Sequence, residues 1–282
     1  MNTAITLTNN AELTHSQFTW ISESVKSMCG INLHDGKMAL VKARLNKRLR
    51  LLGLKDYGEY VEFVKSQPNS TETQAMLDAL STNLTAFFRE PRHFDFLRQV
   101  VLPAMKQADN RKIRIWSAGC SSGEEAYSIA ITLAESLPDI AEWDVGLLAT
   151  DISNTALGRA RQAVYSRDRV SEMTPALLKK YFCPAIENAQ KAYQVRDFIR
   201  EKVNFARLNL VEAWPMKGRF DVIFCRNVMI YFDKHTQERL IARLAAQLAP
   251  GGYLFIGHSE SLAGVKHELN YVQPTIYQRE QR

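Results

Sequence analysis

The sequence has no closely spaced cysteine pair, no long apolar run and no strong excess of one charge. Its four cysteines are far apart among 282 residues, which excludes a disulfide framework and a cysteine zinc site. We therefore expect a reducing, cytoplasmic setting and no bound metal. No apolar stretch approaches the roughly 20 residues that span a bilayer, and the first residues do not resemble a secretory signal. The net charge of +6 is too small to identify a partner by itself.

The first 86 residues read as helices without strands. One helix face carries apolar residues at helical spacing, namely Phe18, Ile21, Val25 and Met28. Thr14 or Ser16 can cap the start of this helix, and Gly30 is placed to end it. The segments 35–54, 56–66 and 71–84 repeat the helical pattern. We predict a small all-α domain over residues 1–86, followed by a linker helix over 87–110.

Strands and helices alternate from residue 111 onward. Strand patterns occur at 112–118 ("KIRIWSA"), 143–151 ("WDVGLLATD"), 220–227 ("FDVIFCRN") and 253–259 ("YLFIGHS"). Alternating strands and helices predict right-handed βαβ crossovers and a mostly parallel sheet. The closing "YVQPTIYQRE" is predicted to return as an antiparallel hairpin strand. We expect residues 111–282 to form this domain, with a small antiparallel β insert at about 186–204.

The turn after the first strand, "GCSSGEE", lacks the G-x-G-x-x-G pattern of dinucleotide-binding proteins. An anion here would meet Glu124 and Glu125, at a cost of several kcal/mol if the charges are desolvated. A cationic ligand such as S-adenosylmethionine, which has an ammonium, a sulfonium and no phosphate, suits the turn better. The alternative is structural: Ser122 caps the helix, and each acid stabilises its dipole by roughly 0.3–1 kcal/mol.

Polar residues also follow two other strands. Asp151 ends the second strand, where an acid can accept hydrogen bonds from ribose hydroxyls, although an Asp here can equally cap a helix. Arg226 and Asn227 follow a buried strand and need partners there. His258, Ser259 and Glu260 do not indicate a hydrolase, because adjacent residues cannot converge as a catalytic triad.

Several of these segments together resemble the CheR-type chemotaxis receptor methyltransferases. The resemblance rests on "STNLTAFFRE", "WSAGCSSGEEAYSIA", "ATDIS", "FDVIFCRNVMIYFD" and "LAPGGYLFIGHSE". It implies a Rossmann-like class I methyltransferase domain, α/β in class, with an antiparallel C-terminal hairpin strand and a β insert, preceded by an all-α domain. It also implies methyl transfer from S-adenosylmethionine to glutamate side chains of chemoreceptor helices, giving methyl esters for sensory adaptation and S-adenosylhomocysteine as product.

The resemblance assigns roles to residues that match the family motifs. It implies that Arg89, Arg226 and Tyr231 are catalytic. The cofactor-binding residues that it implies are Asn83, Thr85, Arg89, Glu125, Asp151, Asn209, Leu210, Arg226 and Asn227. Two alternatives stay open: a methyltransferase acting on RNA or a small molecule, and an inactive cofactor-binding scaffold.

A basic segment from Lys37 to Lys55 contains no acid. Such a run is usually a solvated helix face, but the resemblance points to glutamate-rich receptor helices as its partner. The residues expected to make this contact are Lys37, Arg44, Lys47 and Arg48. The insert stretch "YFCPAIENAQKAYQVRD" has no glycine, whereas family members that hold a receptor C-terminal pentapeptide tend to have a glycine-bearing loop there. We expect no pentapeptide tethering, no nucleic-acid partner, no membrane insertion and a monomer.

Overall fold

The computed structural model describes residues 12–68, 70–107, 111–137 and 139–281, and the chain divides into two compact units. One unit comprises Met1–Thr82 with Tyr231–Asp233, and the other comprises Asn83–Ile230 with Lys234–Arg282. Residues 83–86, which the sequence assigned to the helical domain, belong to the second unit. No helix in the described part of the chain is long and apolar enough to cross a membrane.

The first unit is helical, as predicted. Its elements are α1 (His15–Cys29), η1 (Asp35–Lys37), α2 (Met38–Leu52), α3 (Tyr57–Ser66) and α4 (Thr71–Leu80). Thr14 caps α1 in a reciprocal capping box with Gln17, and Gly30 ends it in the left-handed conformation with φ 78°. The buried face of α1 consists of Phe18, Ile21, Val25 and Cys29. The predicted start and end of this helix are therefore confirmed, as are three residues of its apolar face, whereas Cys29 and not Met28 is the fourth buried residue.

A distant piece of chain, residues 231–233, completes the helical unit. The backbone N–H of Asn32 donates to the Tyr231 carbonyl at 2.7 Å. The Lys26 ammonium lies 2.8 Å from the Asp233 carboxylate. The motif "FCRNVMIYFD" is therefore divided between the two units, which its uninterrupted sequence does not reveal.

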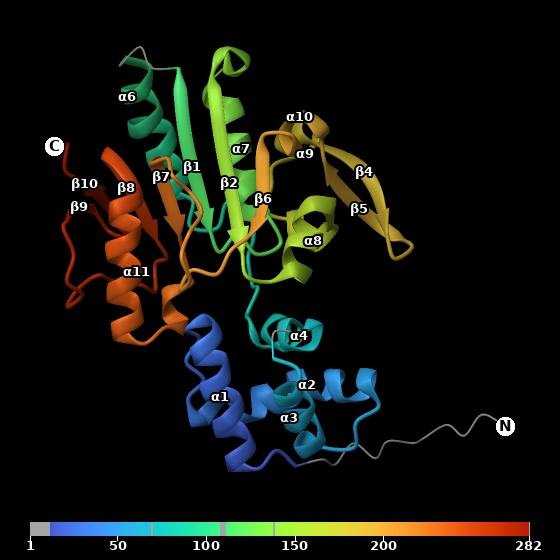
Figure 1. Ribbon diagram of the computed structural model, residues 1–282. Helices are drawn as coiled ribbons and strands as arrows, with labels where there is room; N and C mark the ends of the chain where they lie inside the picture. Colours follow the sequence, from blue (N-terminus) through green and yellow to red (C-terminus); the bar gives the residue numbers. More distant parts are fainter. Residues whose placement is uncertain (1–11, 69, 108–110, 138, 282) are drawn as a thin grey trace. The chain divides into compact units, whose positions relative to one another are not determined.

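The second unit contains a seven-stranded sheet with the order β6-β2-β1-β7-β8-β10-β9 (Figure 1). Its strands are β1 (Lys112–Ala118), β2 (Asp144–Asp151), β6 (Val203–Arg207), β7 (Phe220–Cys225), β8 (Leu248–Ile256), β9 (Leu269–Gln273) and β10 (Ile276–Arg279). The pairs β1–β2, β1–β7, β2–β6 and β7–β8 are parallel. Strand β10 runs antiparallel to both β8 and β9. The predicted parallel sheet with an antiparallel C-terminal hairpin is confirmed, with β9 as the edge strand.

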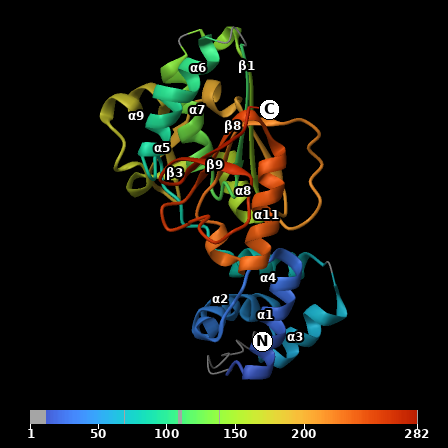
Figure 2. The ribbon, with the colours of Figure 1, turned by 90° about the vertical axis from the view of Figure 1, so that its left-hand side faces the viewer.

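Helices cover both faces of this sheet. They are α5 (Arg92–Phe96), the π-helical turn η2 (Leu97–Val101), α6 (Leu102–Gln107), α7 (Glu124–Ser136), α8 (Asn154–Gln162) and α11 (Lys234–Gln247), with a short turn η3 (Ile140–Glu142). Figure 2 shows α6 and α7 on one side of the sheet and α11 on the other. Phe94, Leu97 and Val101 are buried in the main core. The segment predicted as a linker helix over 87–110 is thus a layer of the domain as far as residue 107, and 108–110 lie outside the described residues.

The insert forms a separate three-stranded sheet with the order β3-β5-β4. Its elements are β3 (Val164–Ser166), η4 (Arg167–Val170), α9 (Pro175–Tyr181), β4 (Phe182–Glu187), β5 (Gln190–Val195) and α10 (Asp197–Arg200). The sheet spans 164–195 rather than the predicted 186–204, because residues 197–200 are helical and 203–207 belong to the main sheet. Strand β3 has only three residues and is too short to show a period, so the start of the insert could not be predicted.

Candidate cofactor site at the carboxyl ends of the strands

Most residues singled out from the sequence lie after the carboxyl ends of the parallel strands. The strand order runs outward in opposite directions from β1 and β7, so the chain changes direction between these two neighbours. In open α/β sheets, ligands bind outside the carboxyl ends of the strands at such a switch point. The loops that follow β1, β2, β6, β7 and β8 therefore form the candidate site.

The turn after β1 is fixed by glycines and by local hydrogen bonds. Gly119 and Gly123 have φ values of 88° and 97°, which side-chain-bearing residues rarely adopt. The N–H groups of Gly119 and Cys120 both donate to the Thr150 carbonyl, at 2.8 and 2.9 Å. A Cβ on Gly119 would lie 2.5 Å from Val228. The turn therefore packs directly against the loop after β7, and only glycine fits at residue 119.

Glu124, the first acid of α7, is a buried structural residue. Its side chain is fully buried, and it accepts a hydrogen bond from Arg169 at 2.8 Å. The Ser122 hydroxyl donates to the same carboxylate at 2.7 Å. Burial raises the pKa of Glu124, and the contacts with Ser122 and Arg169 oppose this rise. The predicted Ser122 cap is wrong, because α7 begins after Gly123 and the Ser122 hydroxyl binds a side chain instead.

Glu125 lies between the end of β1 and the loop after β7. It accepts hydrogen bonds from the Ser117 hydroxyl at 2.7 Å and from the Arg226 guanidinium at 3.0 Å. Burial raises the pKa of the Glu125 carboxyl, and the Arg226 charge acts against this effect. The two acids are adjacent in the sequence, but in the structure Glu124 pairs with Arg169 and Glu125 pairs with Arg226.

Arg226 has partners for its whole guanidinium group. It is 5% exposed. Its guanidinium lies 2.9 Å from Glu90 and 3.0 Å from Glu125, and it donates to the Arg89 carbonyl. The expectation that polar residues after β7 need partners is met by a buried ionic cluster. Sequence reasoning missed Glu90, because an acid next to Arg89 looks like any surface acid.

Glu260 holds the loop that carries Arg226 and Asn227. Its carboxylate accepts backbone N–H bonds from Gly257 at 2.6 Å, Asn227 at 2.9 Å, Met229 at 2.7 Å and Ile230 at 3.3 Å. Burial raises the pKa of Glu260, and these backbone donors oppose that rise. This role was also missed, although an acid soon after a buried strand is a signal for it.

Asp151 connects the first two loops of the site. Its carboxylate accepts from the Ser121 N–H at 2.8 Å and from the Ser153 N–H at 2.9 Å. Ser153 itself caps α8 by accepting from Ala156 at 3.1 Å, so Asp151 is not the N-cap residue. The simple helix-cap interpretation of Asp151 therefore does not account for it.

The segment that follows residue 82 runs beside the turn after β1. The Asn83 carbonyl accepts from the Ser121 hydroxyl at 2.9 Å, and the Thr85 carbonyl accepts from Arg169 at 3.1 Å. Arg89 is half-buried, and its guanidinium donates to the Leu84 carbonyl at 3.1 Å. The Asn83 backbone thus contacts the turn after β1, whereas the Thr85 backbone contacts Arg169 of the insert, which pairs with Glu124.

The remaining predicted residues lie in two places. Asn209 and Leu210 are buried in the loop after β6, where the Asn209 side chain accepts from the Val211 N–H at 3.3 Å. Tyr231 ends the short turn η5 (Met229–Tyr231) and is grouped with the helical unit. Tyr231 therefore belongs to a different compact unit from the other predicted site residues.

Comparisons with known proteins agree on one family. The sequence profile of the SAM binding domain of CheR methyltransferases matches residues 83–278, and that of their all-alpha domain matches 16–81. A chemotaxis protein methyltransferase 2 of Pseudomonas aeruginosa is 43% identical over 94% of this chain and 93% of its own. A probable chemotaxis protein methyltransferase of Rhizobium etli is 42% identical over 90% and 96%, respectively. One from Borreliella burgdorferi is 38% identical over 96% of both chains.

Proposed function

The chain belongs to the CheR methyltransferase family and is an S-adenosylmethionine-dependent methyltransferase, and we propose that its methyl acceptors are glutamate side chains of chemoreceptor helices. The relatives named above are chemotaxis protein methyltransferases, which supports this acceptor. The observation that carries the proposal is this similarity of 38–43% identity over at least 90% of the chain. Asp151 beyond the end of β2, beside the glycine turn after β1, supports the cofactor, whereas Glu124 and Glu125 are already paired with Arg169 and Arg226. We also place the protein in the cytoplasm, where these receptor helices lie.

The cofactor is proposed to lie along the loops after β1, β2 and β6. Asp151 accepts from the ribose hydroxyls, and its position beyond the end of β2 supports this role. Glu125 faces the amino-acid or adenosyl part of the cofactor, while Asn209 and Leu210 flank the adenine. Asn83 and Thr85 complete the site. Their backbone contacts beside the turn support this placement.

The acceptor carboxylate needs no general base. A glutamate side chain has an ordinary pKa of about 4.3 and is already ionised at neutral pH. The protein can therefore act by aligning the carboxylate oxygen with the methyl carbon and sulfur of S-adenosylmethionine and by excluding water. Charge is neutralised as the methyl group is transferred, so a dry site favours the reaction.

The two arginines of the proposal have different tasks. Arg226 is already bound to Glu90 and Glu125, so we assign it to positioning the loop and the cofactor's methionine portion. The Arg89 guanidinium makes one hydrogen bond among the described residues, to the Leu84 carbonyl, and it can orient the acceptor carboxylate. Tyr231 is proposed, from its motif, to shape the methyl channel.

Transfer of a tritiated methyl group into receptor-containing membranes tests this function. We expect counts that mild alkali releases, as carboxyl methyl esters require. Arg89→Ala should lower turnover at least tenfold with little change in cofactor affinity, whereas Arg98→Ala, an exposed arginine of the same unit, should retain it. Alkali-stable counts in RNA would support the alternative acceptor, and no incorporation at all would support an inactive scaffold. Either result would contradict the proposal.

The receptor-binding surface is proposed to be the exposed basic part of α2. Arg44 donates to the Leu80 and Ser81 carbonyls at 2.8 and 2.9 Å, and Arg48 pairs with Glu72, so both are used within the helical unit. Lys37, Lys47 and Arg50 stay exposed. These three charges can attract an acidic helix, and the attraction should weaken with added salt.

Charge reversal tests this surface. Lys47→Glu with Arg50→Glu should raise the KM for receptor several-fold with little change in kcat, because only docking is affected. The matched control is Lys266→Glu on the other unit, another exposed lysine. An unchanged KM in the double variant, or an equal rise in the control, would place the receptor elsewhere.

The insert is proposed not to tether a receptor tail. Its β4–β5 hairpin turns at Asn188 and Ala189, with φ values of 48° and 61°, so a tight two-residue turn replaces a glycine-bearing loop. Calorimetry with a receptor C-terminal pentapeptide should detect no binding. Saturable binding would overturn this part of the proposal.

A further inference from the structure

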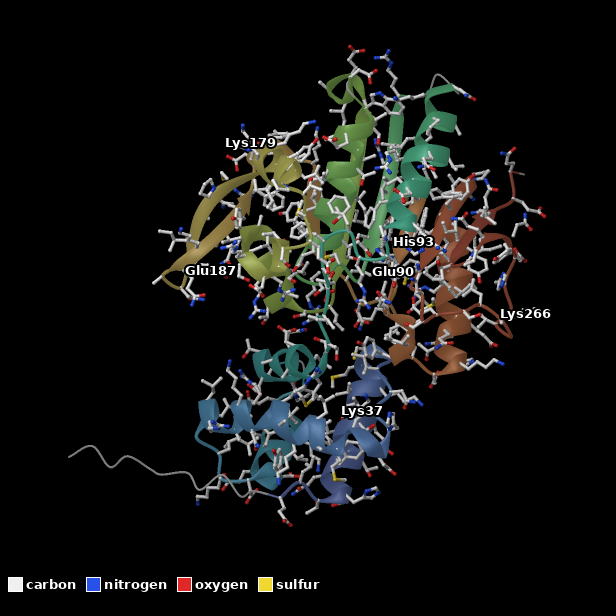
Figure 3. The ribbon with its side chains drawn as sticks, turned by 180° about the vertical axis from the view of Figure 1, so that it is seen from behind. Lys37, Glu90, His93, Lys179, Glu187 and Lys266 are labelled. Atoms are coloured by element: carbon white, nitrogen blue, oxygen red, sulfur yellow. The ribbon has the colours of Figure 1, made fainter. Side chains whose placement is uncertain are left out.

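Three side chains with metal-ligating atoms converge at one place in the α/β unit, beside the ionic cluster of Arg226. Glu90, His93 and His258 each offer one ligand atom, and these atoms lie within 4.8 Å of one another. Figure 3 shows Glu90 and His93 close together in this unit. The His93 and His258 rings are 5.4 Å apart between their centroids.

The His93 ring presents a lone pair to this cluster. Its Nε2 lies 2.7 Å from the Thr275 hydroxyl oxygen, and that hydroxyl donates its single proton to the Pro274 carbonyl at 2.5 Å. The Thr275–Pro274 bond favours the tautomer in which Nε2 donates to Thr275, and in this tautomer Nδ1 carries the lone pair. This Nδ1 has no hydrogen-bond partner among the described residues, although His93 is only 1% exposed. Nδ1 lies 3.6 Å from a Glu90 oxygen.

Two electron-rich atoms thus face each other, and the Arg226 guanidinium that pairs with this Glu90 oxygen makes no hydrogen bond with His93 Nδ1. From this arrangement we propose that Glu90, His93 and His258 bind a divalent transition-metal ion of the Zn²⁺ class.

The ligand set and its supports match such a site. Two imidazoles and a carboxylate are typical zinc ligands, and three protein ligands leave one position for water or another molecule. With metal–ligand bonds of about 2.0–2.2 Å, tetrahedral ligand atoms lie about 3.4 Å apart, close to the Nδ1–Oε2 separation. The exposed His258 can rotate to complete the set. The bond from His93 Nε2–H to Thr275 fixes the tautomer, as outer-shell partners of metal-bound histidines do.

Arg226 sets the strength of this site. Its guanidinium already pairs with Glu90 and repels a second cation, while the Glu125 carboxylate, also bound to Arg226, partly offsets that repulsion. We therefore expect weaker binding than at a closed four-ligand structural site. The sequence predicted no metal because it lacks paired cysteines. His93 and His258 are too far apart in the chain to form a recognisable metal-binding motif.

Titration of the chelator-treated full chain with Zn²⁺ tests the site. Calorimetry should show one ion per chain, and His258→Ala should weaken binding at least tenfold. His235→Ala, which removes an exposed histidine from α11, should bind as the wild type does. Binding to scattered surface histidines would instead be unchanged in His258→Ala, and this result, or the absence of stoichiometric binding, would overturn the proposal.

A second readout protects the test against misfolding. Nuclear magnetic resonance of the imidazole nitrogens should show the His93 Nδ1 resonance shifting on addition of Zn²⁺ while Nε2 keeps its proton. A shift confined to other histidines would contradict the proposal. Neither measurement uses methyl transfer, so the metal site can fail while the proposed function stands.

Discussion

The turn after β1 and the loop after β7 lie side by side at the same edge of the sheet, yet different forces hold them. The turn is fixed by two left-handed glycines and by bonds to the neighbouring strand β2. The loop is fixed by buried charges: Arg226 binds acids from two other segments, and Glu260 binds the N–H groups of the loop itself. The first arrangement can be read from a short motif, whereas the second includes ion pairs between residues more than 100 positions apart.

This difference explains why the two regions should respond differently to mutation. Removing a partner from a buried ionic cluster leaves an uncompensated charge, which is expensive. Changing Gly119 strains its own backbone and displaces the Val228 side chain, but it leaves no buried charge uncompensated. The loop after β7 should therefore be the more sensitive region, and the following predictions test this ranking.

Arg226→Ala should have the largest effect. It leaves Glu90 and Glu125 buried without their counter-charge, so the free energy of unfolding should fall by about 3–5 kcal/mol and methyl transfer should be lost. Urea unfolding of the full chain measures the first effect. The control is Arg98→Ala, whose partner Asp95 is exposed, and it should change stability by less than about 1 kcal/mol. A similarly small change in Arg226→Ala would mean that the cluster does not hold the loop.

Glu260→Ala should rank second. It removes the acceptor for four backbone N–H groups, and two of these bonds, from Gly257 and Met229, are buried. A buried donor left unsatisfied costs about 1–3 kcal/mol, and movement of the loop toward water should recover part of this cost, so the net loss should stay below that of Arg226→Ala. Glu260→Gln keeps one oxygen acceptor and should recover part of both stability and turnover. Unfolding and kcat should be measured on both variants. Equal losses in Ala and Gln would show that side-chain volume matters here rather than hydrogen bonding.

Gly119→Ala should cost less than either. The left-handed backbone costs about 1–2 kcal/mol for a residue with a Cβ, and Val228 must also move away. Gly158, inside α8 with open space around its Cα, is the matched site, where alanine should stabilise the protein by about 0.4–1 kcal/mol. Thermal unfolding of the two variants should move in opposite directions, and a shared direction would contradict the backbone argument.

Alkylation of the cysteines should show the smallest difference between the two regions. Its rate at a buried thiol measures how readily the surrounding structure opens. Burial raises the pKa of Cys29 to about 11, and it raises those of Cys120 and Cys225 as well. Cys183, in the insert, is partly exposed. Iodoacetamide at pH 8 should therefore modify Cys183 first, and mass spectrometry of peptides identifies the site. Rapid modification of Cys120 would show that the turn after β1 opens more readily than its contacts indicate.

The sequence was sufficient to predict features that depend on local pattern. The capped helix from 15 to 29, the parallel strands and the glycine turn after β1 follow from periodicity and from single-residue conformational preferences. Features that depend on long-range pairing could not be predicted. The transfer of residues 231–233 to the helical unit, the pairing of Glu90 with Arg226, and the use of Arg48 by Glu72 each join residues far apart in the chain. The Ser122 cap was predicted wrongly because Gly123 shifts the helix start by one residue.

The most direct test of the central claim is whether Asp151 binds the ribose of the cofactor. Calorimetry should compare S-adenosylhomocysteine with its 2′-deoxy analogue on the wild type and on Asp151→Asn. A hydrogen bond to a charged group contributes about 1.5 kcal/mol or more, so the wild type should prefer the hydroxylated ligand at least tenfold. In Asp151→Asn this preference should nearly vanish. An equal preference in both proteins would contradict the account of the site.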